Sequence, residues 1–339
     1  MTVRRFVVVA SAFAALPAGA LAQTDAPLTP PALHWESAAF DPAAQRLVVY
    51  GGTGSTGRYV AESWAWDGTR WSVLADSAAG PGARHAHAMT YDARRSRLVM
   101  FGGSFETSDT TIPPAQRARR LCDTWSLTNG AWARVTEIPT CPIDGTAGGS
   151  LVVAGAGGDL LFVEGRPASA DTALVRTRLW RPEGATWALV DSTGPRRPPT
   201  ASGGAAFDVR RSVLVVPVLA GPDSGVWEWD GARWRHARVA GPPTRRIYGI
   251  TYDSRRQRVA LIGGLTSGPR RPLADHWTWD GSAWTEVPSA GVQPPARSHA
   301  TLLDDPRHGR LLYFGGAGEG GLQRELWIFD RDGWRRASP

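Results

Sequence analysis

The sequence predicts an all-β protein, a six-bladed β-propeller made of four-stranded antiparallel blades. Three observations lead to this prediction. A pair of tryptophans seven residues apart recurs six times, and each pair follows a second hairpin whose last strand usually ends in two glycines. Successive pairs lie about 50 residues apart, a spacing typical of propeller blades. No segment shows helical periodicity of useful length, so four short strands repeated six times remain, which is the unit plan of a closed propeller.

The first 22 residues have the layout of a cleavable secretory signal. Two arginines precede an apolar run from Phe6 to Leu16, and small residues stand before Gln23. The apolar run has 11 residues, and a helix of that length is too short to cross a hydrocarbon layer of ~30 Å. We therefore expect a signal peptide over 1–22, an extension over 23–33, and export of a monomer without a membrane span to the periplasm or the extracellular space.

The charge and the cysteines limit the possible partners. All 38 basic residues are arginine and 31 residues are acidic, which gives a net charge of +7. This balance attracts anionic partners modestly, but there is no nucleic-acid motif and no dense basic run, so we expect no nucleic-acid partner. Cys122 and Cys141 fit one disulfide in an exported protein, with two separate thiols as the alternative. Their spacing fits no zinc pattern.

The downstream hairpin of each repeat carries the tryptophan pair. In three copies an Asp-Gly pair lies midway, as in SWAWDGTRW at 63–71, and favours a two-residue type I′ turn. Such a turn would place Trp64 opposite Trp71 across two strands. Because the pairs recur at one phase, we interpret them as packing between blades, whereas Trp35 lies outside the repeat and its role stays open. The pairs are Trp64 and Trp71, Trp125 and Trp132, Trp180 and Trp187, Trp227 and Trp234, Trp277 and Trp284, and Trp327 and Trp334.

The upstream hairpin of each repeat has a turn led by aspartate. AMTYDARRSRLVMFGG at 88–103 shows a short strand, a turn that begins at Asp92, and an apolar strand that ends in two glycines. We assign the same place in other copies to Asp41, Asp253 and Asp304, and expect each aspartate to accept hydrogen bonds within its own turn. No helix and no Lys-Ser/Thr follow the glycines. The glycines therefore indicate unusual backbone angles or close packing at a strand end.

These features resemble the kelch repeat: a hydrophobic strand ending in Gly-Gly, a variable loop, then aromatic residues with a tryptophan fixed downstream. The resemblance implies a six-bladed kelch-type β-propeller, of the kind also seen in the central domain of galactose oxidase, as a single domain over 34–339. We expect the blades at 34–76, 83–138, 145–192, 199–239, 245–289 and 296–337.

Function is expected where the repeats differ, on the face that carries the loops between the second and third strands. The longest such loop, 104–121, contains Arg117, Arg119 and Arg120 and ends beside Cys122. The connections between blades repeat a Pro-then-Arg theme, and the resemblance would turn their side chains toward the central channel. An arginine-lined channel mouth suits carboxylate or sulfate groups, although solvated charge is the alternative. The candidate ligand-binding residues of these connections are Arg84, His87, Arg246, Tyr248, Arg297 and His299.

The resemblance raises two kinds of catalysis. The copper chemistry of galactose oxidase is not expected, because the seven histidines show no metal spacing, and a fold does not carry an activity with it. We therefore expect no metal and no cofactor. Exported six-bladed kelch propellers also include sialic acid epimerases, which interconvert sugar anomers with arginine and acidic residues in the channel, and this resemblance makes Glu36 a candidate catalytic residue. The leading hypothesis is a non-catalytic propeller that binds a protein or a glycan, including an anionic one. The alternative is a sugar epimerase or mutarotase.

Overall fold

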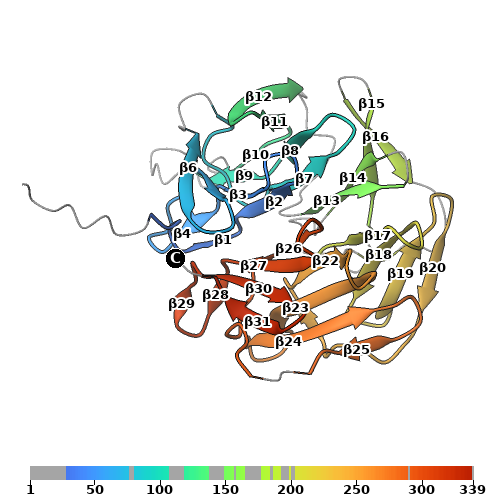
Figure 1. Cartoon of the computed structure of the whole chain (residues 1–339). Helices are drawn as coiled ribbons and strands as arrows, with labels where there is room; N and C mark the ends of the chain where they lie inside the picture. Colours follow the sequence, from blue (N-terminus) through green and yellow to red (C-terminus); the bar gives the residue numbers. More distant parts are fainter. Residues whose placement is uncertain are drawn as a thin grey trace, which may run out of the picture.

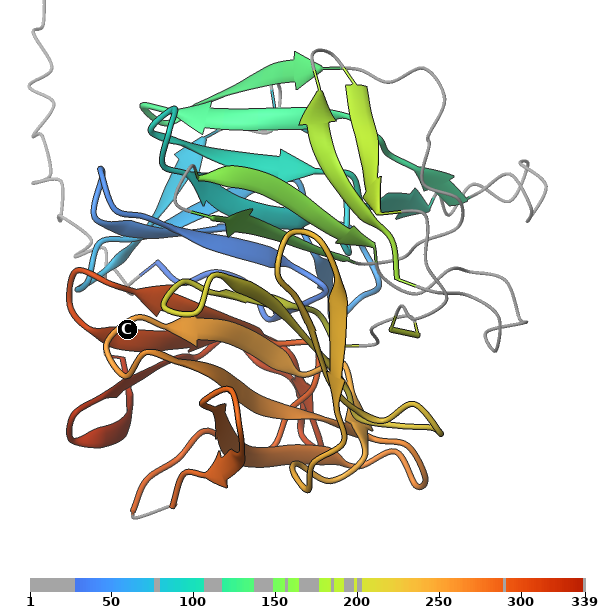
Figure 2. The ribbon, with the colours of Figure 1, turned by 90° about the vertical axis from the view of Figure 1, so that its right-hand side faces the viewer.

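The computed structural model describes residues 28–75, 80–106, 118–136, 149–155, 158–164, 177–183, 186–191, 198–199, 203–288 and 291–337. Six antiparallel sheets stand in a ring around a common centre (Figure 1). Figure 2 shows the same strands, with the loops that connect them, from the side. The prediction of six four-stranded blades is confirmed. Within the described ranges no helix has the length and apolar character needed to cross a membrane.

Within each blade the strands follow one another from the centre of the ring outward. Blade 1 contains β2 (Ser37–Asp41), β3 (Arg46–Tyr50), β5 (Ser63–Trp66) and β6 (Trp71–Ala75); blade 2 contains β7 (Ala88–Asp92), β8 (Arg97–Phe101), β11 (Thr124–Thr128) and β12 (Ala131–Thr136); blade 3 contains β13 (Gly149–Ala154), β14 (Asp159–Glu164), β15 (Leu179–Glu183) and β16 (Thr186–Asp191). Blade 4 contains β17 (Ala206–Asp208), β18 (Val213–Val218), β19 (Gly225–Trp229) and β20 (Trp234–Ala237); blade 5 contains β22 (Gly249–Asp253), β23 (Arg258–Thr266), β24 (Pro272–Trp279) and β25 (Trp284–Glu286); blade 6 contains β26 (Thr301–Asp305), β27 (Arg310–Phe314), β30 (Leu326–Asp330) and β31 (Gly333–Arg336).

Short strand pairs extend the blades on the side of the long loops. They are β1 (Leu33–His34) with β4 (Thr53–Gly54), β9 (Ser104–Glu106) with β10 (Ala118–Arg120), β21 (Arg245–Arg246) with the end of β23, and β28 (Ala317–Gly318) with β29 (Gly321–Leu322). We call this side the loop side. The opposite side, which carries the tight turns within each hairpin, is called the turn side.

The hydrophobic core is divided into six clusters, and each cluster joins two neighbouring blades. The cluster between the first and last blades, for example, brings Trp64 and Trp71 of blade 1 against Phe314 and Ile328 of blade 6. The other clusters join blades 1 and 2, 2 and 3, 3 and 4, 4 and 5, and 5 and 6. The repeated tryptophans thus pack between blades, as the sequence predicts. Each buries on the order of 200 Å², so their regular placement makes a large share of the hydrophobic contact.

The predicted register of the tryptophan hairpins is wrong by two residues. Trp71 lies opposite Trp66, while Trp64 pairs with Val73. The loop has four residues instead of two, because the Asp67 side chain accepts hydrogen bonds from the backbone N–H groups of Thr69 and Arg70. The same pairing joins Trp229 with Trp234 and Trp279 with Trp284. An aspartate that caps its own turn therefore competes successfully with the type I′ hairpin that Asp-Gly favours.

Among the described residues, no strand is exchanged between the two ends of the ring. In two other junctions the N–H of the second glycine, Gly52 or Gly264, donates to the carbonyl of the arginine that enters the next blade. The junction of blades 6 and 1 repeats this bond, from Gly316 N–H to the carbonyl of Leu33. Figure 1 shows these first (blue) and last (red) blades side by side. Closure therefore rests on side-chain packing and on the backbone bond that the repeat already supplies.

The turn aspartate of blade 6 is Asp305, so the assignment to Asp304 is corrected. Asp305 accepts hydrogen bonds from His308 and Arg310, as Asp253 does from Arg256. The fourth residue after each turn aspartate has a positive φ, which holds for Gly309 at 58° and Gln257 at 55°. Counting from Asp305 keeps this spacing. Asp304 is consequently the residue directly before the turn aspartate. It lies on the channel wall, where the other blades have a different residue.

Candidate functional site: the central channel

The inner strands of the blades surround a channel with a volume of about 1000 Å³. Its wall runs from Arg246, Leu265 and Arg270 on the loop side to Val209 and Pro306 on the turn side. This volume lies at the upper end of the range typical of ligand pockets. The channel is thus the natural place to test for binding.

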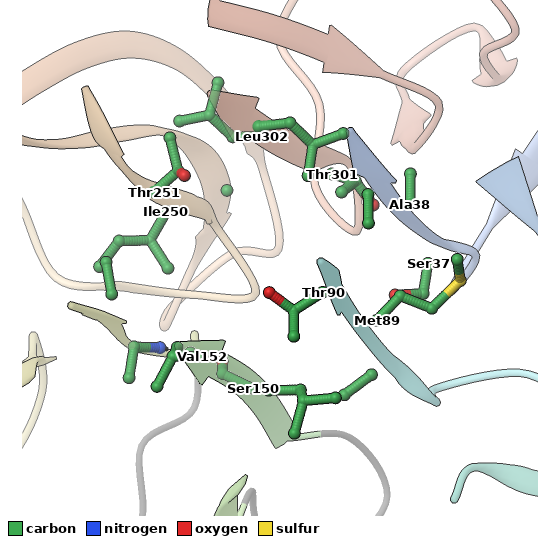
Figure 3. Close-up of a pocket in the computed structure, with 18 of the residues that line it drawn as sticks. Ser37, Ala38, Met89, Thr90, Ser150, Val152, Ile250, Thr251, Thr301 and Leu302 are labelled. Atoms are coloured by element: carbon green, nitrogen blue, oxygen red, sulfur yellow. Dashed lines mark hydrogen bonds between the residues drawn. The ribbon is translucent and has the colours of Figure 1, made fainter. Parts of the chain in front are cut away.

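The middle of the channel is lined by uncharged side chains, which are either apolar or carry a hydroxyl group. Figure 3 shows residues of β2, β7, β13, β22 and β26 standing around the opening, and they include five hydroxyl groups. Converging inner strands leave little room for larger groups. The wall can donate and accept hydrogen bonds through these hydroxyls, which belong to Ser37, Thr90, Ser150, Thr251 and Thr301.

The loop-side mouth is shaped by residues in the left-handed backbone region. Trp35, Ala86, Ile247 and His299 occupy equivalent positions of four blades and have φ between 52° and 59°. This conformation is uncommon for residues other than glycine and is unusual for a β-branched residue such as Ile247. Hydrogen bonds between blades hold it, since Ala86 N–H donates to the Trp35 carbonyl and His299 N–H to the Ile247 carbonyl. All four residues line the channel.

An aromatic cluster lies on the loop side over blades 6, 1 and 2, and two of its members, Trp35 and His299, line the channel. The Trp35 ring lies 4.5 Å from the ring of His299 and 6.4 Å from that of His85, measured between centroids. Tyr59 lies 4.8 Å from His85 and 5.8 Å from Phe105. All five side chains are partly exposed. We call these five residues the mouth cluster.

The imidazoles at the mouth are uncharged near pH 7. Burial lowers the pKa of His34 and of His85, and it lowers the pKa of His299 to about 4. His85 shares a hydrogen bond of 2.7 Å with the Ser104 hydroxyl, and His299 one of 2.8 Å with Ser298. Positive charge reaches the mouth from blade 5 instead, where Arg246 and the exposed Arg270 line the channel.

Glu36 is a buried carboxyl group at the seam between the first and last blades. A Cβ placed on Gly315 of blade 6 would lie 2.2 Å from its Oε1, so only glycine leaves room for this side chain. Neither carboxyl oxygen makes a hydrogen bond of ordinary length and angle to a described residue, although its own backbone N–H and the Thr301 hydroxyl act on the group. Burial raises the pKa of Glu36 to about 8, against the opposing charge of Arg297. The group is therefore largely protonated at neutral pH.

His87 and Tyr248 occupy the position of Glu36 in blades 2 and 5. Both line the channel but are largely buried, and each projects toward the preceding blade. Tyr248 donates a hydrogen bond of 2.8 Å to the Pro217 carbonyl, and the His87 ring lies 5.6 Å from that of Tyr50. Burial holds the pKa of His87 well below its ordinary value. These two candidates therefore pack between neighbouring blades and also line the channel.

The expected arginine-lined mouth is wrong for two of its three named arginines. Arg84 and Arg297 are 1% and 0% exposed and do not line the channel. Arg84 forms two hydrogen bonds of 2.8 and 3.0 Å with the Asp123 carboxylate, and another with the Gly102 carbonyl. Arg245 repeats this arrangement with Asp275 and the Gly263 carbonyl. Arg84 and Arg245 are thus held in the buried framework by paired carboxylates, whereas Arg297 donates to the Pro295 and Gly315 carbonyls and has no carboxylate partner within salt-bridge distance among the described residues.

The two described arginines of the long loop do not line the channel. Arg119 and Arg120 are exposed on β10, opposite Phe105 and Ser104 of β9. Arg117 and Cys141 lie outside the described residues. Cys122 is buried directly before Asp123, and its disulfide with Cys141 stays a prediction. Of the sequence candidates, the structure brings together Glu36, His87, Arg246, Tyr248 and His299 around the channel.

Sequence reasoning missed four members of the mouth cluster: Trp35, Tyr59, His85 and Phe105. One signal was available, since Trp35 is a tryptophan that breaks the repeat pattern. Tyr59 and Phe105 come from two loops of different length and His85 from the connection between blades 1 and 2, and only folding brings them together. No group of three or more His, Cys, Asp or Glu side chains in the described part of the chain is placed to hold a metal ion.

Comparison with known proteins identifies the fold but no family. No protein-family model matches the chain, and no curated protein matches it either. Among solved structures 447 chains match. One of them, described as "Structure of YjhT", covers 91% of this chain and 99% of its own with a TM-score of 0.65 and 15% sequence identity. At that identity the likeness concerns the fold alone, so this chain is similar in architecture to YjhT and is a six-bladed β-propeller.

Proposed function

We propose that the protein is a non-catalytic binding propeller whose ligand is a glycan, held at the loop-side mouth of the central channel. The mouth cluster is the observation that carries the proposal. Partly exposed rings of a tryptophan, a tyrosine, a phenylalanine and two histidines lie in contact on the loop side, and Trp35 and His299 among them line the channel. Aromatic faces of this kind offer apolar area with fixed geometry, which suits the C–H face of a sugar ring.

The rest of the mouth fits the polar part of a sugar. The hydroxyl groups of the channel wall can bind sugar hydroxyls. Arg246 and Arg270 add positive charge on one side of the opening, and a planar guanidinium suits a carboxylate or sulfate group. The ligand class is therefore a glycan that can carry an acidic substituent. We also propose that the protein is exported, in keeping with the signal-like residues 1–22.

Binding would be measured by calorimetry and thermal unfolding against neutral, carboxylated and sulfated sugars. For a sugar that binds, Trp35→Ala should weaken affinity at least tenfold, which corresponds to about 1.4 kcal/mol. Arg246→Met should weaken only acidic sugars, while Arg210→Met on the turn side serves as the matched control. Full affinity in Trp35→Ala would contradict the mouth assignment. If removing the charges of Arg119 and Arg120 abolished binding instead, the site would lie on the 104–121 loop.

An anomer-converting enzyme is the second candidate, and Glu36 favours it. A carboxyl group that lines the channel and has a pKa near 8 holds a proton close to neutral pH, as a general acid requires. In this reading Glu36→Gln abolishes anomer exchange, followed by NMR on a sugar that binds, while affinity is retained. Unchanged exchange in the variant would remove this candidate.

A further inference from the structure

The turn-side end of the channel differs in chemistry from the mouth. The residue directly before the turn aspartate, or before Ala154 in blade 3, lines the channel in each blade and is aromatic in four of them. A strand advances about 3.3 Å per residue, so this level lies roughly 17 Å below His299 along the same strand. The six residues are Phe40, Tyr91, Val153, Phe207, Tyr252 and Asp304.

Asp304 replaces an aromatic residue at this level and has no basic partner in the described part of the chain. Two turn aspartates close to it do have one: Asp253 pairs with Arg256 at 2.9 Å, and Asp305 with Arg310 at 2.8 Å. Asp304 interacts instead with Ser254, whose backbone N–H donates a hydrogen bond of 3.3 Å and whose hydroxyl also acts on the carboxyl group. It is partly buried and faces the channel. A carboxylate in this setting lacks a counter-charge.

The surroundings disfavour the ionised form of Asp304 while no cation is present. Burial raises its pKa to about 7, and the neighbouring charges of Asp253 and Asp305 act in the same direction. Tyr252 also lies within electrostatic reach of Asp304 and of Arg210. Arg210 and Arg255 are exposed in the surrounding turns, where Arg255 binds the Gly309 carbonyl. Their repulsion should keep the affinity for a cation modest.

We propose that this end of the channel is a second binding site, in which the Asp304 carboxylate and the aromatic wall take a primary ammonium ion on an apolar chain. The carboxylate would accept a charge-assisted hydrogen bond from the ammonium group. Aromatic faces attract a cation that comes within about 6 Å of the ring centre. The apolar chain would lie against Val209, Pro42 and Pro306, which line the same end. An anion is disfavoured here because it would meet Asp304.

The test uses n-butylammonium as the probe, titrated into the full chain by calorimetry. Wild type should bind it in the millimolar range, and Asp304→Asn should weaken binding at least tenfold. Asp332→Asn removes the same charge from an exposed turn of the same blade and should leave binding unchanged. The neutral probe n-butanol should not distinguish wild type from Asp304→Asn. Unfolding midpoints of both variants confirm that they are folded.

The pH dependence provides an independent readout. Because the pKa of Asp304 is near 7, the affinity for butylammonium should rise about tenfold from pH 6 to pH 8 as the carboxyl group ionises. Equal affinity in Asp304→Asn, constant affinity between pH 6 and 8, or no binding by wild type at tens of millimolar would each overturn the proposal. These outcomes do not depend on whether the mouth binds a sugar.

Discussion

Arg245 and Arg246 are neighbours in the chain, yet they lie in two regions with opposite roles. Arg245 belongs to the buried framework, where it is 0% exposed and bonded to Asp275. Arg246 lines the open channel mouth. The same contrast separates Arg297 from His299 in blade 6. The buried arginine recurs in blades 2, 5 and 6, whereas the second residue after it varies and lines the channel, as Ala86, Ile247 and His299. In this repeat, recurrence marks the framework and variation marks the channel.

The largest effect should come from breaking the framework pair. Asp275→Ala leaves the Arg245 guanidinium buried without its partner, and loss of one member of a buried pair costs about 3 to 5 kcal/mol of stability. Arg246→Met, one residue further along the chain from Arg245, should change the free energy of unfolding by less than about 0.5 kcal/mol. Urea unfolding of both variants measures the difference. Equal losses would mean that the two arginines do not belong to different regions.

A smaller effect should appear as a pH dependence of the seam that holds Glu36. The folded pKa, about 8, lies above the ordinary value of 4.5, so the folded state binds more protons between these values. Stability should therefore fall as pH rises through this window, by roughly 2 kcal/mol between pH 5 and 7. Glu36→Gln removes this contribution. Subtracting its unfolding profile from that of wild type isolates Glu36 from the histidines, whose lowered pKa values act in the opposite direction. A difference that does not change with pH would contradict a protonated Glu36.

The smallest effect should separate the strained mouth from the regular wall. Ala86 has a φ of 52°, and a left-handed backbone costs a residue with a Cβ roughly 1 to 2 kcal/mol. Ala86→Gly should therefore stabilise the protein by up to about 1 kcal/mol. Ala88, two residues later in β7, has ordinary strand geometry, and Ala88→Gly should destabilise it by a similar amount. Thermal unfolding of the two variants gives the comparison, and two shifts of the same sign would argue against strain at the mouth.

The framework was predictable to the degree that it repeats. Six tryptophan pairs at constant spacing gave the number of blades, and their constant phase indicated packing. The register failed where the Asp67 side chain formed a longer turn than its Asp-Gly motif favours. The blade 6 turn was misassigned because two aspartates stand together there, and only the backbone angle at Gly309 and the partners of Asp305 separate them.

The site was predictable in part. Glu36, Arg246 and His299 were singled out and line the channel, but Arg84 and Arg297 were expected there and lie in the framework. A Pro-then-Arg motif does not show which way its guanidinium points. That direction depends on an acid about 30 to 40 residues downstream, such as Asp123 for Arg84, and a buried guanidinium turns to the acid that pairs with it.

The sequence by itself determined the all-β class, the six blades and the packing role of the tryptophans, because these follow from a local pattern copied six times. The tertiary structure decided which varied residues meet. Trp35, His85 and His299 come from three blades, and hydrogen bonds between those blades fix the backbone that brings their rings to one mouth. The tertiary structure also decided the setting of Asp304, because the described strands packed around it bring no basic partner to its carboxyl group. Contacts between blades join residues far apart in sequence, and no local pattern encodes them.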